Sequence, residues 1–90
     1  EMKTIEGFRL RLVMGQPTLV GEGIGQVNFN KLLTLNAAAA YLWQSVEQKE
    51  FSVDDLARLL TEHYGINLAI ARKDADKIAQ KWITHGLVQK

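Results

Sequence analysis

The chain has 90 residues, of which 47% are hydrophobic, and a formal net charge of +1, which predicts a single domain over residues 1–90 and argues against a dedicated, strongly basic nucleic-acid binder. It contains no cysteine, so disulfides and thiolate chemistry are excluded. No apolar run approaches the roughly 20 residues of a membrane span and no signal peptide is visible, so a cytoplasmic location is the expectation.

The first third of the chain has the composition of β-strands. Residues 2–7 are expected to lead into a strand over residues 8–14, where apolar side chains alternate with two arginines on a solvated face. Gly15-Gln16-Pro17 has turn composition, and a short second strand is predicted over residues 18–20. A third strand is predicted over residues 26–35, because apolar residues again fall on alternate positions.

The hydrophobic period changes at Asn36. After this residue the apolar side chains recur at helical spacing, at Ala39, Leu42, Trp43 and Val46. Asn36 is a favourable N-cap, because its side-chain oxygen can accept a hydrogen bond from an unpaired N–H of the first turn. We therefore expect the third strand to run directly into a helix over residues 37–48, with Trp43 in the core.

Two further helices are predicted. The second begins at Ser52, which stands in capping-box spacing with Asp55, and ends at Gly65. The third covers residues 68–85 and carries small and apolar residues on one face, including Trp82. Three strands followed by three helices predict an α+β, winged-helix-like fold, in which a three-stranded antiparallel sheet packs on a three-helix unit.

No combination of residues points to catalysis or to a metal site. The two histidines, His63 and His85, fall in different predicted helices with no acidic cluster beside them. An acid–base pair would require buried or closely spaced carboxylates, and the sequence suggests neither. We expect a protein that is not an enzyme and that carries no cofactor.

Cations recur along the third predicted helix. They are Arg72, Lys73, Lys77 and Lys81, interspersed with Asp74 and Asp76. In a winged helix such cations could follow DNA phosphates, whereas the aspartates are typical of an ordinary solvated face. A winged-helix DNA-binding protein is therefore the alternative function.

The third predicted strand would lie at an edge of the sheet. Open edges recruit foreign strands unless they are blunted, and here only Lys31 looks like a guard against such pairing. An open edge beside a helix can accept an extended peptide as an additional strand. The competing interpretations are that Leu87-Val88 covers the edge, or that a second copy of the chain does so in a homodimer.

Five motifs follow one another along nearly the whole chain. They are VNFNKLLTLNAAAAYLW from Val27 to Trp43, Ser52-Val53-Asp54-Asp55-Leu56, a Tyr64-Gly65 stop, Asp74 within the third helix, and a Gly86-Leu87-Val88 ending. Together they resemble the family of pyrroloquinoline quinone synthesis protein D (PqqD). The resemblance implies three antiparallel strands and three helices. It also implies a RiPP recognition element, a peptide chaperone that binds the leader of a ribosomally made precursor and presents it to a maturation enzyme such as a radical SAM protein.

The resemblance also implies a binding site, because the leader in that family adds to the third strand and lies against the third helix. Carried over to this chain, the strand positions are Val27, Asn28, Phe29, Asn30, Lys31, Leu32 and Leu33. The implied groove residues of the third helix are Arg72, Lys73, Asp76, Ala79 and Ile83. Basic residues on that helix would favour an acidic leader.

The chain departs from the quinone-pathway members of that family at two places. Those members usually carry Asp-Gly after the first helix and a Pro-Glu pair before the third strand. Here these regions read Gln48-Lys49-Glu50 and Gly21-Glu22-Gly23. The departure favours a relative that serves a precursor peptide outside pyrroloquinoline quinone biosynthesis.

Overall fold

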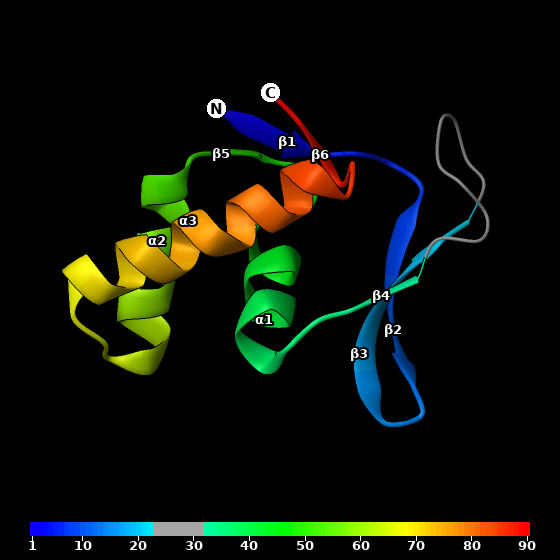
Figure 1. Ribbon diagram of the computed structural model, residues 1–90, viewed down its shortest axis with the longest axis horizontal. Coiled ribbons are helices and arrows are strands. Elements are labelled where there is room, and N and C mark those ends of the chain that lie inside the picture. The colour runs from blue at the N-terminus through cyan, green and yellow to red at the C-terminus, as the bar shows by residue number, and fades with distance from the viewer. Residues whose placement is uncertain (23–31) are drawn as a thin grey trace.

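The computed structural model describes residues 1–22 and 32–90 (Figure 1). Within these residues the structure has three helices and two three-stranded antiparallel sheets, in the strand orders β5-β1-β6 and β2-β3-β4. The elements are β1 (Met2–Thr4), β2 (Phe8–Val13), β3 (Gln16–Gly21), β4 (Leu32–Thr34), α1 (Ala37–Val46), β5 (Glu50–Phe51), α2 (Val53–Tyr64), α3 (Leu68–Thr84) and β6 (Val88–Gln89). The predicted α+β fold is confirmed, and the β5-β1-β6 sheet is an addition to it.

The turn between β2 and β3 consists of Met14 and Gly15, whose φ angles of 51° and 80° suit a two-residue hairpin loop. The prediction that Gln16 and Pro17 belong to the turn was wrong, since both lie in β3. The Glu22 N–H donates to the Gly7 carbonyl at 2.8 Å, which fixes the alternation of bonded and non-bonded pairs along the hairpin. By this alternation the main chain of Pro17 faces β4 and not β2, so proline costs the β2–β3 ladder no hydrogen bond; toward β4 its carbonyl accepts from the Leu35 N–H.

The outer part of the hairpin extends beyond the helices (Figure 1). As a result Leu12 is 76% exposed and Met14 is 98% exposed. The expectation of one half-buried face along the whole of the first strand is therefore wrong beyond Leu10. Only Phe8 is buried and Leu10 partly buried against the core.

The joint between β4 and α1 agrees with the prediction. The Asn36 side-chain oxygen accepts a hydrogen bond from the Ala39 N–H at 2.8 Å, and Leu35 is buried next to it. The described part of the third predicted strand is β4, and residues 26–31 lie outside the described residues. The helix ends at Val46 rather than at Gln48, because Gln48 has a positive φ of 63° and donates its N–H to the Thr4 hydroxyl.

The second sheet was missed by the sequence analysis. Residues 2–4 form its central strand rather than a simple lead-in, and they pair with β5 on one side and β6 on the other. Leu87 is fully buried and Val88 pairs with Thr4. The C-terminal segment therefore covers β1, and the idea that it covers the third strand is wrong.

The core is built around two tryptophans, as predicted. Trp43 of α1 and Trp82 of α3 meet edge to face with ring centroids 5.2 Å apart, and Phe51 meets Trp82 in the same way at 6.1 Å. The helix α2 begins with the predicted capping box of Ser52 and Asp55. The small face of α3 packs against α2 through buried residues, which are Ala71, Ala75 and Ala79.

Candidate functional site

The outer edge of β4 presents unused main-chain groups. The Leu35 N–H donates to the Pro17 carbonyl at 2.8 Å, in the same register that pairs Leu33 with Leu19. Because bonded and non-bonded pairs alternate in an antiparallel ladder, the N–H and C=O groups of Leu32 and Thr34 point away from β3. Among the described residues no strand pairs with that outer side.

The side chains of β4 do little to guard this edge. Leu32 is 63% exposed and Thr34 is exposed, whereas Leu33 turns inward and packs against the core. None of these three residues is charged, although charge is the usual protection of an edge strand. The described part of β4 can therefore accept a further strand without burying a charge.

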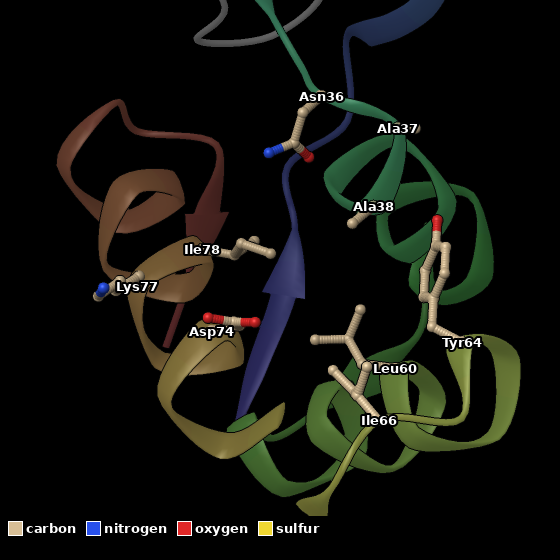
Figure 2. A pocket seen from close by; sticks show the side chains of 9 residues that line it. All are labelled: Asn36, Ala37, Ala38, Leu60, Tyr64, Ile66, Asp74, Lys77 and Ile78. Carbon is tan, nitrogen blue, oxygen red and sulfur yellow. The ribbon is translucent and has the colours of Figure 1, made fainter. Parts of the chain in front are cut away.

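A cavity of about 630 Å³ begins where β4 ends (Figure 2). Three segments enclose it: the start of α1, the end of α2 with the residues that follow, and the middle of α3. The lining residues are Asn36, Ala37, Ala38, Leu60, Tyr64, Ile66, Asp74, Lys77 and Ile78. The volume is within the usual range of small-ligand pockets, about 300–1,000 Å³.

The lining of this cavity, which we call the α1–α3 pocket, is mainly apolar. Figure 2 shows Ala38 and Leu60 on one side of the space and Ile78 on the other, while Lys77 points away from it. Asp74 and the Asn36 amide supply the polar groups. A large apolar side chain fits this chemistry, with room for one polar contact at the rim.

The wall at Tyr64 is supported by an aromatic cluster. His63 stacks on Tyr41 with ring centroids 3.9 Å apart and meets Tyr64 edge to face at 4.6 Å. The sequence assigned His63 no role, with no acidic cluster beside it, and the structure adds this packing role. In the part of the chain that the structure describes, no group of three or more His, Cys, Asp or Glu residues could hold a metal ion.

None of the α3 residues predicted for the groove lines the α1–α3 pocket. Arg72 forms an ion pair with Asp54 of α2 at 3.3 Å, and Lys73 and Asp76 are exposed. Ile83 is half-buried against the core, and Ala79 is fully buried, so its side chain is not accessible to a ligand in this conformation. Successive helix residues are about 100° apart, which places Asp74, Lys77 and Ile78 on the opposite side of the buried stripe.

Of the predicted strand positions, the structure describes Leu32 and Leu33, and residues 27–31 lie outside the described residues. The pocket residues of α1 and α2 were missed, with Asn36 named only as a cap. A pattern of Asn36 followed by small residues was visible in the sequence, but its position opposite α3 depends on the tertiary packing.

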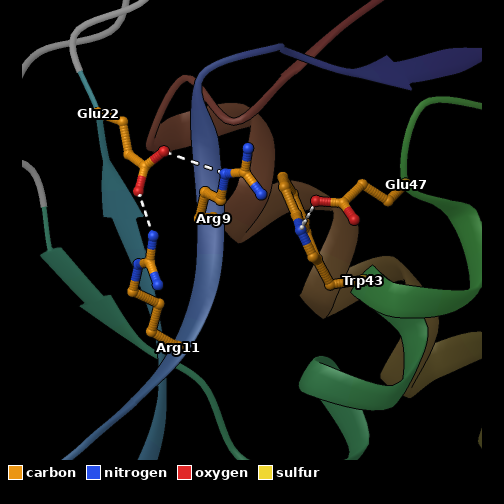
Figure 3. Close-up of polar contacts among 5 residues, drawn as sticks. All are labelled: Arg9, Arg11, Glu22, Trp43 and Glu47. Atoms are coloured by element: carbon orange, nitrogen blue, oxygen red, sulfur yellow. Dashed lines mark hydrogen bonds and ion pairs between the residues drawn. The ribbon is translucent and has the colours of Figure 1, made fainter.

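An ion-pair cluster covers the exposed face of the hairpin (Figure 3). Arg9 Nε and Arg11 Nη2 donate to the two carboxylate oxygens of Glu22 at 3.0 and 2.8 Å. The hydrogen bond from Arg11, aided by the positive charges of both arginines, holds the pKa of Glu22 below its ordinary value. This cluster joins β2 to the residue that follows β3.

Comparison with known proteins places the chain in context. The family described as "Coenzyme PQQ synthesis protein D (PqqD)" matches residues 12–88, whereas no curated protein matches. A solved structure described as lasso peptide synthetase B1 complexed with the leader peptide has a TM-score of 0.71 at 19% identity, covering 100% of this chain and 99% of that one. Another, TbiB1 in complex with the TbiA(beta) leader peptide, has a TM-score of 0.72 at 11% identity, covering 97% and 94%. At these identities the likeness shows a shared fold.

No helix in residues 1–22 and 32–90 has the length and apolar character needed to cross a membrane.

One of the cations that the DNA-binding interpretation would use is already paired within the protein, since Arg72 forms an ion pair with Asp54. Asp74, on the same helix, lines the pocket. A carboxylate at that position would repel a phosphate backbone.

Proposed function

Because the chain belongs to the coenzyme PQQ synthesis protein D (PqqD) family, we propose that it is a peptide-binding module. In this proposal it binds the leader of a ribosomally made precursor peptide and presents that peptide to a maturation enzyme. The observation that carries the proposal is the open edge of β4, with the main-chain groups of Leu32 and Thr34 directed outward beside an apolar pocket. The module itself needs no catalytic group, because strand addition uses only main-chain hydrogen bonds and side-chain pockets.

In this proposal the backbone of β4 fixes the position of the peptide, and the side chains around the pocket determine which peptide is bound. Main-chain pairing at Leu32 and Thr34 would fix the position of the peptide along the strand. Since β4 continues through Leu35 and Asn36 into α1, a peptide that extends past Thr34 reaches the α1–α3 pocket. The pocket then selects for a large apolar side chain just beyond the paired stretch.

The two structural neighbours support this proposal. Both are described as complexes with leader peptides, and both share the fold over nearly the whole of this chain. A chain with the same fold, an open β4 edge and an unoccupied side of α3 is suited to the same kind of ligand. The maturation enzyme is the second partner, and a leader held by its backbone leaves the rest of the precursor accessible to that enzyme.

The proposed contacts differ from those implied by the resemblance in one respect. The resemblance points to Arg72, Asp76 and Ile83, whereas the pocket favours Asp74 and Ile78 for the peptide-facing side of α3, with Lys77 pointing away from the space. Selection for an acidic leader would therefore come from the exposed cations outside the pocket on that flank, Lys77 and Lys81, and not from a charge that points into it.

The direct test is a titration of ¹⁵N-labelled protein with a candidate leader peptide, taken from a short precursor gene beside the gene for this chain. We expect saturable shifts of the Leu32 and Thr34 amides and of the pocket residues Ala38 and Ile78. The expected affinity is sub-micromolar, about −8 kcal/mol or somewhat better. Shifts confined to the exposed cations of α3, and lost on adding salt, would instead indicate a non-specific electrostatic attraction, which is the kind of binding that the DNA-binding alternative predicts.

A further inference from the structure

The β2-β3-β4 sheet has a second open edge, on β2. In the described part of the chain β2 pairs only with β3. The Gly7–Glu22 hydrogen bond fixes the alternation, so Arg9, Arg11 and Val13 face β3 through their main-chain groups. The N–H and C=O groups of Leu10 and Leu12 therefore point outward, to the side that no described strand occupies.

This edge has opposite charges at its two ends. Arg9 and Arg11 share the single carboxylate of Glu22, so the hairpin face keeps one unbalanced positive charge. Beside Phe8 lies a polar cavity of about 310 Å³, whose charged lining residues are the three glutamates Glu6, Glu22 and Glu47 and one cation, Arg9, so that the lining is net negative. Figure 3 shows Glu22 and Glu47 on opposite sides of β2. Glu22 lies on the side of β3, and Glu47 lies on the side away from β3.

A second copy of this chain is a poor occupant of the β2 edge. An antiparallel pair of β2 strands centred on Leu10 would place Arg9 of each copy opposite Arg11 of the other. Like charges directly opposite each other destabilise a strand pair. The charges thus disfavour self-pairing in this register, whereas a strand of complementary charge meets no such repulsion.

The tip of the hairpin adds apolar surface next to this edge. Leu12 is largely exposed and Met14 almost fully so, and Met14 occupies a left-handed conformation with φ of 51°. Such hairpin positions usually hold Asn, Asp or Gly, so methionine at this position is expected to lower the stability of the hairpin in the protein without a partner. An apolar side chain held out at a strained position is better explained by a protein surface that covers it.

We propose that β2 is a docking edge for an extended segment of the enzyme that acts on the bound peptide. The segment pairs antiparallel with Leu10 and Leu12, faces Arg11 with an acidic residue, and places a basic residue in the cavity between Glu6 and Glu47. Apolar surface of the enzyme covers Met14. The identity of the partner rests on the proposed function, whereas the edge and its charge pattern do not.

The probe is a synthetic ten-residue peptide of alternating threonine and valine, with one glutamate near its N-terminus and one lysine near its C-terminus. We expect saturable shifts of the Leu10 and Leu12 amides on titration into the ¹⁵N-labelled chain. An isomer with glutamate and lysine exchanged should bind about fivefold more weakly, from two exposed ion pairs. The variant Arg11→Glu should remove or reverse that preference. Equal binding of the two isomers, or no saturable shift, would overturn the proposal.

Matched variants separate this edge from the other one. Leu12→Pro, which removes the outward N–H at an exposed position, should abolish probe binding, whereas Leu12→Ala should keep it. Thr34→Pro should leave probe binding intact and remove leader binding. If no leader binds at Thr34 while the probe still binds at Leu10, the proposed function fails and the β2 edge stands. Shifts at Thr34 instead of Leu10 would show that the probe uses β4 and would refute the second edge.

Discussion

The substitution Thr34→Pro tests the open β4 edge most directly. The Thr34 N–H points away from β3, so proline deletes a donor that only a guest peptide would use. One main-chain hydrogen bond contributes about 0.5–1.5 kcal/mol net, and leaving the peptide's carbonyl buried without a donor costs about 1–3 kcal/mol. We therefore expect the dissociation constant of a candidate leader to rise roughly 10- to 100-fold, as measured by isothermal titration calorimetry.

Two neighbouring substitutions supply the controls. Thr34→Ala keeps the N–H and should bind the leader with an affinity close to that of the wild type. Leu33→Pro should behave in the opposite way, because the Leu33 N–H faces Leu19 within the ladder and the side chain packs on the core. Urea unfolding should show a loss of about 3 kcal/mol or more for Leu33→Pro and a change of less than about 1 kcal/mol for Thr34→Pro.

Two results would refute this reasoning. If Thr34→Pro and Thr34→Ala bind the leader equally well, the outer edge of β4 is not where the peptide pairs. If Thr34→Pro unfolds as easily as Leu33→Pro, the main-chain groups along β4 do not alternate between inward and outward in the way that the Leu35–Pro17 hydrogen bond requires.

Three further predictions concern the pocket, the ion-pair cluster and a helix cap. Ala38→Phe fills the α1–α3 pocket and should weaken leader binding about tenfold with little change in stability; unchanged calorimetric affinity would remove the pocket from the site. The lowered pKa of Glu22 means that its stabilisation is complete above the ordinary carboxyl pKa and is lost as the pH falls through the lowered value. The stability difference between wild type and Glu22→Gln in urea should therefore shrink between pH 5 and roughly pH 3, and a constant difference would contradict this. Ser52→Ala removes the capping box of α2 and should cost about 1 kcal/mol in urea unfolding without altering leader affinity, and a large loss of binding would contradict it.

The features that sequence reasoning found are those with short-range causes. Asn36 and Ser52 were recognised as caps because each contacts an N–H three residues away. Trp43 and Trp82 were placed in the core because helical spacing alone puts them on the apolar face, and in the structure the two rings meet. In each case the signal lies within one or two turns of the same helix.

The features that it missed depend on distant parts of the chain. The β5-β1-β6 sheet joins Met2 to Phe51 and Thr4 to Val88, and strands of two or three residues are too short to show a period. The side of α3 that bounds the pocket also could not be read from the sequence. Both flanks carry charges and an isoleucine, Ile78 on one and Ile83 on the other, and only the packing of α1 and α2 decides which flank is the open one.

The two edges of the β2-β3-β4 sheet offer a guest the same kind of main-chain hydrogen bonds, so backbone pairing cannot direct a leader to one of them. The difference comes from the side chains around each edge. At β4 a paired peptide reaches the apolar α1–α3 pocket, and burial of one large apolar side chain is worth about 1.5–3 kcal/mol, a preference of roughly 10- to 150-fold. At β2 the same peptide would meet Arg9, Arg11 and the carboxylates beside Phe8. Because the C-terminal segment pairs with β1 instead, it does not compete for β4, and the choice of edge rests on the one apolar side chain that the leader brings to the pocket.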